Sequence, residues 1–531
     1  MDAQIVESRP PSWKYAAGVF ALQIPGLVAA AWFFRDALNP DGVAYLRIAS
    51  RCAQGHPGPA ISGHWGPMLS LLIAPFLMAG VPPLAAARAV MALSAMVFLL
   101  GCRRIFCKAM LGGRLYYWGL GTMAMLSIPW SVEVITPDLL LAGVVLLAFA
   151  EMPASGWHLR PGTAFGCGLL WGLAYWIKAV ALPLGILVCL GMAVLQWRKN
   201  PGARLQIARA AGLTLAGIVL AAGPWVAVLS GHYGKLTVST SASHNHALVG
   251  PSVVRPVHLL DEGFRRPERG QITIWEDPPL PGPDWSPWEN WRNAARQIRI
   301  MERNTPIVLS ILTRISLAFP ILAVVMLTWP GKFRTDPDDG TNCGWFLLPV
   351  AALGFIYLPN YLMPDEVRYF YAAAPLLFVG GAALLPRVGF RRRPMMWRYG
   401  AAALAGTLLI PALFRFAYES SQTLMAGQCA RVLAQRMARA GLEAPLAGSG
   451  MLPGGRAGLY TAYFLGQPWL GDELSPRAVD FEGSGAGLIV VNRGSAIAQE
   501  LAGDAFFRNL DGLLFSPAEA GQFPLQVFGR K

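Results

Sequence analysis

Apolar stretches of about 20 residues recur along this chain of 531 residues, and each is about as long as a helix must be to cross a lipid bilayer. Only 14% of the residues are charged, whereas about a quarter are charged in an ordinary soluble domain. About eleven such stretches stand between charges or Gly/Pro clusters. The sequence therefore predicts an all-α polytopic membrane protein, with spans near Lys14–Phe34, Leu84–Gly101, Tyr116–Pro129, Asp138–Ala150, Thr163–Ile177, Leu182–Trp197, Ile207–Ser230, Pro306–Trp329, Trp345–Leu362, Tyr369–Leu385 and Tyr399–Tyr418.

The basic balance of the chain does not indicate a nucleic-acid partner. The formal net charge is +14, but in a membrane protein the side on which positive residues fall carries the information. Seven cysteines occur without a CxxC pair, which argues against a zinc ribbon or a thioredoxin-type site. Nothing in the sequence indicates whether Cys52 and Cys429 lie close together, so a disulfide between them stays open.

Positive residues are distributed unevenly between the predicted loops. Arg9 and Lys14 precede the first span and no small-residue cleavage site follows it, so we expect an uncleaved first helix. With a cytoplasmic N-terminus, the short outer turns hold only Lys178 and Arg368. The inner loops then hold Arg103, Arg104, Lys108, Arg114, Arg160, Arg198, Lys199, Arg204, Arg209, Lys332, Arg334, Arg387, Arg391, Arg392, Arg393 and Arg398.

This orientation puts three polar segments outside: residues 35–83, 231–305 and 419–531. Within the first, residues 67–79 are apolar but too short to span, which predicts a helix at the outer interface. The last lacks long apolar runs and contains an amphipathic pattern over residues 427–441 and a buried strand pattern over 487–492. We therefore expect a membrane domain over residues 1–418 and a small soluble α/β domain over 419–531.

An acidic residue follows the first span directly. Asp41 stands in the sequence Asn39-Pro40-Asp41-Gly42, with Tyr45 one helical turn further on. A carboxylate just outside the membrane suits a general base that removes a proton from an acceptor hydroxyl, and it also suits a metal ligand. An Asp before a helical run equally suits a helix N-cap. The residues alone leave these interpretations open, and N-caps are the more common.

The motifs along the membrane part, taken in order, resemble those of the GT-C superfamily of membrane glycosyltransferases. The resemblance is to the branch that contains protein O-mannosyltransferases and the lipid A aminoarabinose transferase. It covers nearly all of the chain up to Tyr418. The motifs that carry it are Asp41 with Tyr45, Ile48-Ala49, Gly55, Gly80, Ala87-Arg88, Thr136-Pro137-Asp138-Leu139-Leu140, Lys178 and Arg368-Tyr369.

This resemblance implies an enzyme that moves a sugar from a polyprenyl phosphate carrier to a hydroxyl on a lipid, glycan or protein, usually with inversion. The reaction takes place outside a bacterial-type inner membrane, so the outer segments and the tail are periplasmic. The family's catalytic acid maps to Asp41. The matched acid at the start of the fourth span maps to Asp138, to which the resemblance gives a supporting catalytic role.

A polyprenyl phosphate donor needs a cation at the outer end of a span, because its phosphate must be held while its lipid stays in the bilayer. Lys178 and Arg368 stand at such ends, and the resemblance makes them phosphate contacts with Tyr369 as a hydrogen-bond donor. The alternatives are snorkelling to the interface or, for Arg368, an ion pair with Asp365 or Glu366.

Histidines and tryptophans are concentrated in the outer segments. Tyr45, His56 and His64 are candidates for substrate binding because they lie in the same segment as Asp41. His244 and His246 offer two ligands to a divalent metal, but no third ligand completes a site, so the sequence leaves a divalent metal open without supporting one and indicates no other cofactor. Tryptophans 275, 285, 288 and 291 suit stacking on sugars and equally suit anchoring at the membrane interface.

Two other functions fit the same pattern. A transporter or flippase of a lipid-linked sugar would use a similar cavity and similar cations, but transporter chains often show two related halves, and this sequence shows no internal repeat. The other is a non-catalytic assembly protein of the same fold.

Overall fold

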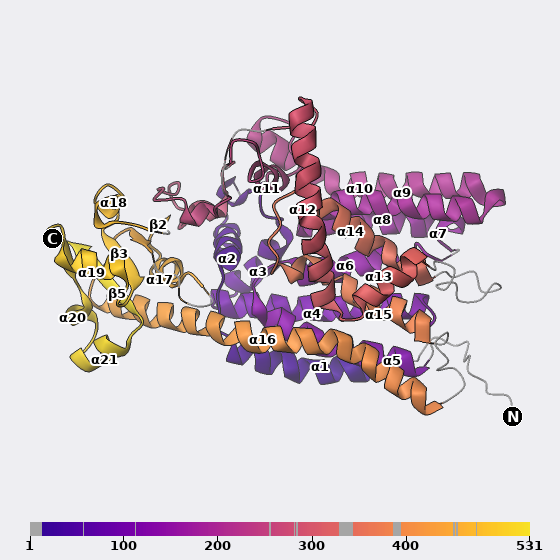
Figure 1. Cartoon of the computed structure of the whole chain (residues 1–531), viewed down its shortest axis with the longest axis horizontal. Coiled ribbons are helices and arrows are strands. Elements are labelled where there is room, and N and C mark those ends of the chain that lie inside the picture. The colour runs from indigo at the N-terminus through magenta and orange to yellow at the C-terminus, as the bar shows by residue number, and fades with distance from the viewer. Residues whose placement is uncertain are drawn as a thin grey trace.

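The computed structural model describes residues 13–328, 343–385 and 394–531, apart from residues 57, 112, 155, 254–255, 281, 283–284, 450–451, 453–454 and 474. Lys332, Arg334, Arg387 and residues 391–393, which the sequence assigns to inner loops, lie outside the described residues. Long helices run side by side in one direction, and a small sheet stands at one end of them (Figure 1). The helices up to this sheet are α1 (Trp13–Phe33), α2 (Pro40–Ala53), α3 (Met68–Met78), α4 (Pro83–Lys108), α5 (Gly113–Glu133), α6 (Asp138–Ala150), α7 (Gly156–Leu159), α8 (Pro161–Ile177), α9 (Ala181–Lys199), α10 (Arg204–Tyr233), α11 (Ser241–Ala247), α12 (Trp291–Ile315), α13 (Phe319–Thr328), α14 (Leu348–Tyr357), α15 (Ala373–Leu384) and α16 (Pro394–Arg439).

Several of these helices are long and apolar enough to cross a membrane. Within the described residues, five meet that condition on their own, and a bent pair makes a sixth. The five are Trp13–Phe33, Pro83–Lys108, Ala181–Lys199, Pro201–Tyr233 and Tyr399–Arg439. The chain is therefore a polytopic α-helical membrane protein, as predicted, although several of the about eleven predicted spans correspond to helices too short to cross a bilayer at 1.5 Å per residue.

The predicted span Pro306–Trp329 is not one straight helix. Its apolar residues belong to the end of α12 and to α13, which meet at an angle of 117°. Helix α12 ends at Ser316, whose backbone is extended. Pro320 has no N–H, so it cannot donate the helical hydrogen bond to the carbonyl of Ser316. In consequence α12 runs across the direction of the long helices (Figure 1).

Close packing of the helices depends on glycine at particular positions. A Cβ on Gly143 of α6 would lie 2.7 Å from the backbone nitrogen of Phe98 in α4, and one on Gly101 would lie 2.7 Å from the carbonyl of Gly143. Such small residues let membrane helices approach closely. This approach fixes the position of α6, whose first residue is Asp138.

A layer of short helices and loops covers the end of the bundle that carries the sheet. It contains α2, the 11-residue α3 and the 3-10 turns η3 (Leu259–Asp261) and η4 (Ile274–Glu276). The predicted interface helix over residues 67–79 corresponds to α3. One continuous apolar cluster joins this layer to the sheet, since it includes Val43 of α2, Trp275 of η4 and Val490 of the sheet. The layer and the tail thus share a core.

The tail begins inside a long helix. The 46-residue α16 passes through position 418 without a break, so the residues that divide the two expected domains lie in one helix (Figure 1). Beyond it, the described part of the tail contains five strands and five helices: β1 (Leu446–Gly448), α17 (Ala457–Leu465), β2 (Trp469–Asp472), α18 (Ala478–Glu482), β3 (Leu488–Asn492), α19 (Ala496–Gly503), β4 (Phe507–Asn509), α20 (Asp511–Leu514), α21 (Pro517–Gln522) and β5 (Leu525–Arg530).

The strands form one mixed sheet in the order β2-β1-β3-β5-β4. Strand β1 is parallel to both β2 and β3, and β5 is antiparallel to β3 and β4. The strand predicted over residues 487–492 is β3, which is buried at Leu488 to Val491 and pairs Val490 with Val527. The predicted small α/β tail is confirmed.

Candidate functional site

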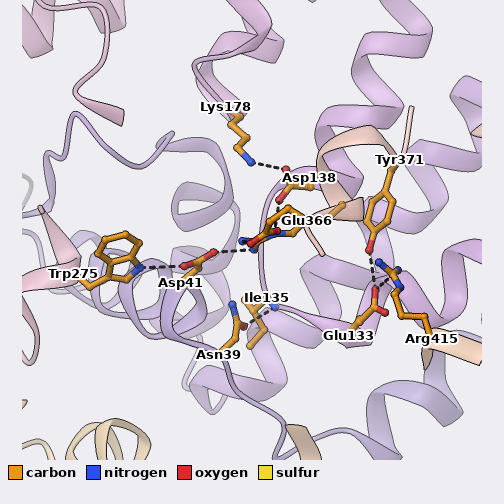
Figure 2. A network of polar contacts seen from close by, with 11 residues as sticks. Asn39, Asp41, Glu133, Ile135, Asp138, Lys178, Trp275, Glu366, Tyr371 and Arg415 are labelled. Carbon is orange, nitrogen blue, oxygen red and sulfur yellow. Dashed lines mark hydrogen bonds and ion pairs between the residues drawn. The ribbon is translucent and has the colours of Figure 1, made fainter. Parts of the chain in front are cut away.

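Asp41 lies in the first turn of α2, where Pro40 begins the helix with its fixed φ. Asn39 is the N-cap residue, in an extended conformation, and its Oδ1 accepts a hydrogen bond from the backbone N–H of Ile135 at 2.9 Å (Figure 2). Asp41 therefore does not cap the helix. Its Oδ1 accepts a hydrogen bond from Trp275 Nε1 at 3.0 Å, and its Oδ2 accepts one from Arg368 Nη1 at 2.8 Å (Figure 2).

These contacts keep Asp41 ionised although its side chain is only 16% exposed. Burial raises the pKa of the carboxyl group, because a low dielectric disfavours the charged form. The charge of Arg368 and the hydrogen bonds from Trp275 and Arg368 more than offset burial, and the pKa of Asp41 lies below its usual value. The result is a buried carboxylate that remains charged at neutral pH.

A second carboxylate, Asp138, lies at the amino end of α6. Its Oδ1 accepts a hydrogen bond from Lys178 Nζ at 2.6 Å, and its side chain is only 2% exposed. Lys178 follows the last residue of α8 in an extended conformation, so its side chain leaves the helix at the same end of the bundle. The loop before α3 packs directly against the backbone just before Lys178, since a Cβ on Gly66 of that loop would lie 2.2 Å from the carbonyl of Ile177.

Arg368 joins the two carboxylates. Its Nη1 bonds Asp41, and its Nε lies 4.0 Å from Asp138 Oδ2. Its Nε and Nη2 also donate to Glu366, at 2.5 and 3.0 Å, in a two-pronged pair. Burial lowers the pKa of Arg368, but Glu366 and Asp41 raise it well above its usual value. Of the predicted alternatives for Arg368, the ion pair with Glu366 is present, whereas Asp365 pairs with Arg314.

Tyr369 lies beside both cations. The Lys178 ammonium is 4.0 Å from the centre of its ring, and the Arg368 guanidinium is 5.4 Å away. The ring also stacks on Tyr357 at 5.0 Å and 8°. Such cation–π contacts hold the two positive charges beside one aromatic ring. The predicted group of Lys178, Arg368 and Tyr369 is thus brought together in space.

An aromatic cluster forms the side of the site that carries Trp275. His64 lies 4.6 to 5.2 Å from the rings of Trp65, His244 and Trp275, and Tyr45 contacts Trp65 edge to face at 5.1 Å. Burial, together with the neighbouring His244, lowers the pKa of His64 to about 3. His64 is therefore neutral at pH 7.

His258 is the other histidine of this cluster. Its ring lies 4.4 Å from that of Trp275, and burial, with the charge of Arg456, lowers its pKa to about 4. No feature of the sequence distinguishes His258 from the other loop histidines.

The remaining predicted residues lie apart. His56 is exposed, and no hydrogen bond, ion pair or ring contact among the described residues joins it to Asp41. His244 bonds the carbonyl of Pro279 and His246 bonds Gln297, so the two face different partners. Within the described residues, no group of three His, Cys, Asp or Glu side chains is placed to hold a metal ion. Cys52 and Cys429 are free thiols.

A second buried network lies next to the site (Figure 2). Glu133, the last residue of α5, accepts hydrogen bonds from Tyr371 Oη at 2.9 Å and from Arg415 Nη2 at 2.8 Å. The Tyr371 ring stacks on Trp130 at 4.0 Å. Because Tyr371 follows Arg368 by three residues and Arg415 belongs to α16, this network attaches α16 to the segment that carries Arg368.

Comparison with solved structures identifies the fold. Two crystal structures of ArnT from Cupriavidus metallidurans, one bound to undecaprenyl phosphate and one in the apo state, match 97% of this chain and 98% of their own, at 15% identity and TM-scores of 0.53 and 0.54. The chain has a GT-C fold. A cryo-EM structure of the arabinofuranosyltransferase AftD from Mycobacteria aligns with 99% of this chain over 40% of the AftD chain, at 14% identity and a TM-score of 0.42. No protein-family model and no curated protein matches the sequence.

Proposed function

We propose that this protein is a glycosyltransferase that moves a sugar from a polyprenyl-phosphate-linked donor to an acceptor hydroxyl on the outer side of the membrane. The observation that carries the proposal is a buried carboxylate, Asp41, kept ionised 2.8 Å from a guanidinium at one end of a membrane bundle. The ionised acid can remove a proton from the acceptor hydroxyl, and the cation beside it can stabilise the phosphate that leaves. The undecaprenyl phosphate bound to ArnT, whose fold this chain shares, supports the donor class.

Asp41 acts as the general base. A carboxylate offers about four lone-pair positions, and Trp275 and Arg368 use one on each oxygen, so an acceptor hydroxyl can still donate to it. The hydroxyl proton passes to Asp41 as the hydroxyl oxygen attacks the anomeric carbon. The bond from that carbon to the phosphate oxygen breaks, and the electron pair leaves with the polyprenyl phosphate. Attack opposite the leaving group inverts the anomeric configuration.

Arg368 and Lys178 stabilise the charge that develops on the leaving phosphate. Both reach the site from the ends of helices, and Asp138 orients Lys178 through the 2.6 Å contact. Carboxylates already bind both cations, so a phosphate must displace at least one carboxylate to bind Lys178 or Arg368. Tyr369 lies beside both cations. Tyr45 and His64 lie close enough to Asp41 to feel its charge, and we place the acceptor and the sugar beside them.

The proposal also orients the molecule. We place the N-terminus in the cytoplasm of a bacterial-type inner membrane, and Asp41 and the tail of residues 419–531 in the periplasm, because that arrangement puts nearly all positive residues of the short connecting loops on the cytoplasmic side. Single thiols introduced near Gly483 should then react with a membrane-impermeant reagent added from outside, and thiols near Arg104 should not. Reaction at Arg104 alone would reverse the orientation.

The change Asp41→Asn tests the function. The amide is nearly the same shape, so donor binding should stay within a few-fold, whereas turnover should fall by about 10² or more because no base remains. Mass spectrometry of the lipid that copurifies with the protein identifies the donor for both assays. Asp36→Asn, which alters the ion pair with Arg431 in the same layer, is the matched control and should keep its turnover.

Two results would contradict the proposal. A flippase or an assembly protein should be little affected by Asp41→Asn, so near-wild-type turnover or lipid transport in that variant would favour those functions. A loss of donor binding as large as the loss of turnover would mean that Asp41 binds the donor and is not the base.

A further inference from the structure

The long helix α12 presents three kinds of surface around its axis. One side is buried against the protein through Gln297, Ile300, Asn304 and Ile311. Two other sides are exposed, and they differ in chemistry. Since α12 crosses the direction of the spanning helices (Figure 1) and packs against the 3-10 turn Val367–Phe370 that carries Arg368, it lies across the bundle near the end that holds the candidate site.

One exposed side is a row of arginines. Arg292, Arg296, Arg299 and Arg303 follow at intervals of four, three and four residues, which places them within about 60° of one another around the helix. Three of them, with Ile300, line a shallow hollow of about 200 Å³. Four guanidinium groups thus share one face of a single helix.

These arginines have no acidic partner in the part of the chain that the structure describes. None forms an ion pair there. Arg296 donates to the backbone carbonyls of Val249 and Gly250, at 2.8 and 2.7 Å, which fixes the direction of its side chain. The one acid within the row's span, Glu302, lies about 60° or more away from each of the four around the helix. The row is a concentrated positive charge.

The other exposed side carries large apolar residues. Trp291, Ile298 and Leu309 are 76%, 58% and 47% exposed, and their spacings of seven and eleven residues are close to two and three whole turns. They therefore lie on one line along the helix, at an angle to the arginine row, and the exposed Glu302 and Thr305 lie on the same line between Ile298 and Leu309. Large exposed apolar residues beside a basic row, as in the first turns of α12, are the pattern of a helix that lies in a membrane interface.

We propose that α12 lies in the bilayer interface on the side of Asp41 and that its arginine row binds the headgroups of anionic phospholipids in that leaflet. Trp291 and Ile298 meet the acyl chains, while the guanidinium groups reach the phosphates just above them. Guanidinium forks match phosphate oxygens, and a basic row that forms no ion pair among the described residues favours anionic over zwitterionic lipids. This proposal does not depend on the proposed sugar transfer.

The test uses the purified full chain in detergent and titrates it with short-chain phosphatidylglycerol or phosphatidylcholine. Arg299→Gln with Arg303→Gln should weaken phosphatidylglycerol binding by about tenfold or more and leave phosphatidylcholine binding unchanged. Arg299→Lys with Arg303→Lys keeps the charge and should stay within about threefold of wild type. Arg439→Gln with Arg508→Gln removes the same charge from exposed positions in the tail and should stay within about twofold.

Three results would overturn the proposal. One is unchanged phosphatidylglycerol binding in the double Gln variant. Another is an equal loss in the tail control, which would mean that net charge alone sets the affinity. The third is full displacement of phosphatidylglycerol by inorganic phosphate at millimolar concentration, which would make the row a site for small anions. The double Lys variant keeps the test informative if the Gln variant does not fold.

Discussion

The charges of the candidate site do not balance. Asp41, Asp138 and Glu366 carry three negative charges, and Lys178 and Arg368 carry two positive ones, all within one set of contacts. A phosphate that enters this cluster meets a net negative charge at neutral pH. Its binding therefore depends on how readily Arg368 exchanges a carboxylate for the phosphate. Glu366 is the carboxylate with no other proposed role, since Asp41 is the base and Asp138 orients Lys178.

We therefore expect opposite effects from two substitutions at this contact. Glu366→Gln removes the competing charge and should strengthen binding of polyprenyl phosphate by about tenfold, because a charge-assisted hydrogen bond contributes about 1.5–3 kcal/mol. Arg368→Ala should weaken it by about tenfold to a hundredfold, and Arg368→Lys should recover only part, because the ammonium lacks the planar fork. Binding of the lipid phosphate to each purified variant measures this. Weaker binding in Glu366→Gln would mean that Glu366 positions Arg368 instead of competing with the phosphate.

The neutral histidines beside Asp41 predict a dependence of stability on pH. Their pKa values of about 3 for His64 and about 4 for His258 lie below the value of about 6.5 in an unfolded chain. Between about pH 4 and 6.5 the unfolded state therefore binds more protons, and stability falls as the pH falls. Each histidine contributes up to about 1.4 kcal/mol per pH unit. Unfolding curves of His64→Phe should show a shallower decline than wild type, whereas His56→Phe, which removes an exposed imidazole, should not.

Residues of the site differ in how well the sequence predicts them. Asp41, Asp138, Lys178 and Arg368 each stand where an apolar run begins or ends, and hydropathy locates such positions. Trp275 lies 234 residues from Asp41 in an irregular loop, and no periodicity says which of several tryptophans turns inward. The sequence therefore predicts the charges of the site and leaves open their hydrogen-bond partners.

For helices, the sequence likewise predicts which segments are apolar but not where each helix bends or ends. Hydropathy predicts that residues 306–329 are apolar, but it does not predict the 117° bend that Ser316 and Pro320 produce between α12 and α13. It also ends a span near residue 418, where charged residues return, although the backbone of α16 continues as a helix to Arg439. Hydropathy reports only how far a segment is buried in lipid. A helix continues for as long as its backbone hydrogen bonds continue, so the end of α16 could not be predicted from hydropathy.

The long helix α16 depends on one close contact with the start of the outer layer. A Cβ on Gly427 would lie 1.9 Å from the backbone carbonyl oxygen of Asp36, which cannot move aside as a flexible side chain does. Gly427→Ala should therefore destabilise the protein by about 1–3 kcal/mol or more. Gly406→Ala in the same helix is the control, because its Cβ meets only Ile410 at 3.8 Å, and it should leave thermal unfolding nearly unchanged. Equal stability of the two variants would show that α16 does not pack on Asp36 in this way.

At the scale of the whole molecule, the tail supports the loop that supplies a hydrogen bond to Asp41. The backbone N–H of Trp469 in β2 donates to the carbonyl of Ile272 at 2.6 Å, and that of Arg265 donates to Leu470 at 2.6 Å. Three residues after Ile272, Trp275 reaches Asp41. Backbone hydrogen bonds thus join the edge strand β2 to the loop that contains Ile272. The same loop ends at Trp275, which donates a hydrogen bond to Asp41. We infer that the tail stabilises the geometry of the base although it supplies no proposed catalytic residue.

Arg456 is the side chain through which this connection can be tested. It lies between Asp472 of β2, at 2.8 Å, and Asp261 of the loop, at 2.7 Å, and all three side chains are at most 9% exposed. Arg456→Ala leaves two buried carboxylates without their cation, a change that costs about 3–5 kcal/mol when a buried pair is broken. The loop should then separate from the sheet edge, the arginines at 265 and 269 should become sensitive to trypsin, and transfer should fall more than donor binding does.

Arg493→Ala is the matched control, because it breaks a 2.8 Å pair with Asp511 that lies wholly within the tail. It should lower the stability of the tail without exposing the loop to trypsin. Equal cleavage in the two variants would mean that general unfolding of the tail, and not the Arg456 contact, releases the loop. Unchanged cleavage and unchanged transfer in Arg456→Ala would show that Trp275 holds its position without the sheet, because its hydrogen bond to Asp41 and its packing on Trp65 would then be sufficient.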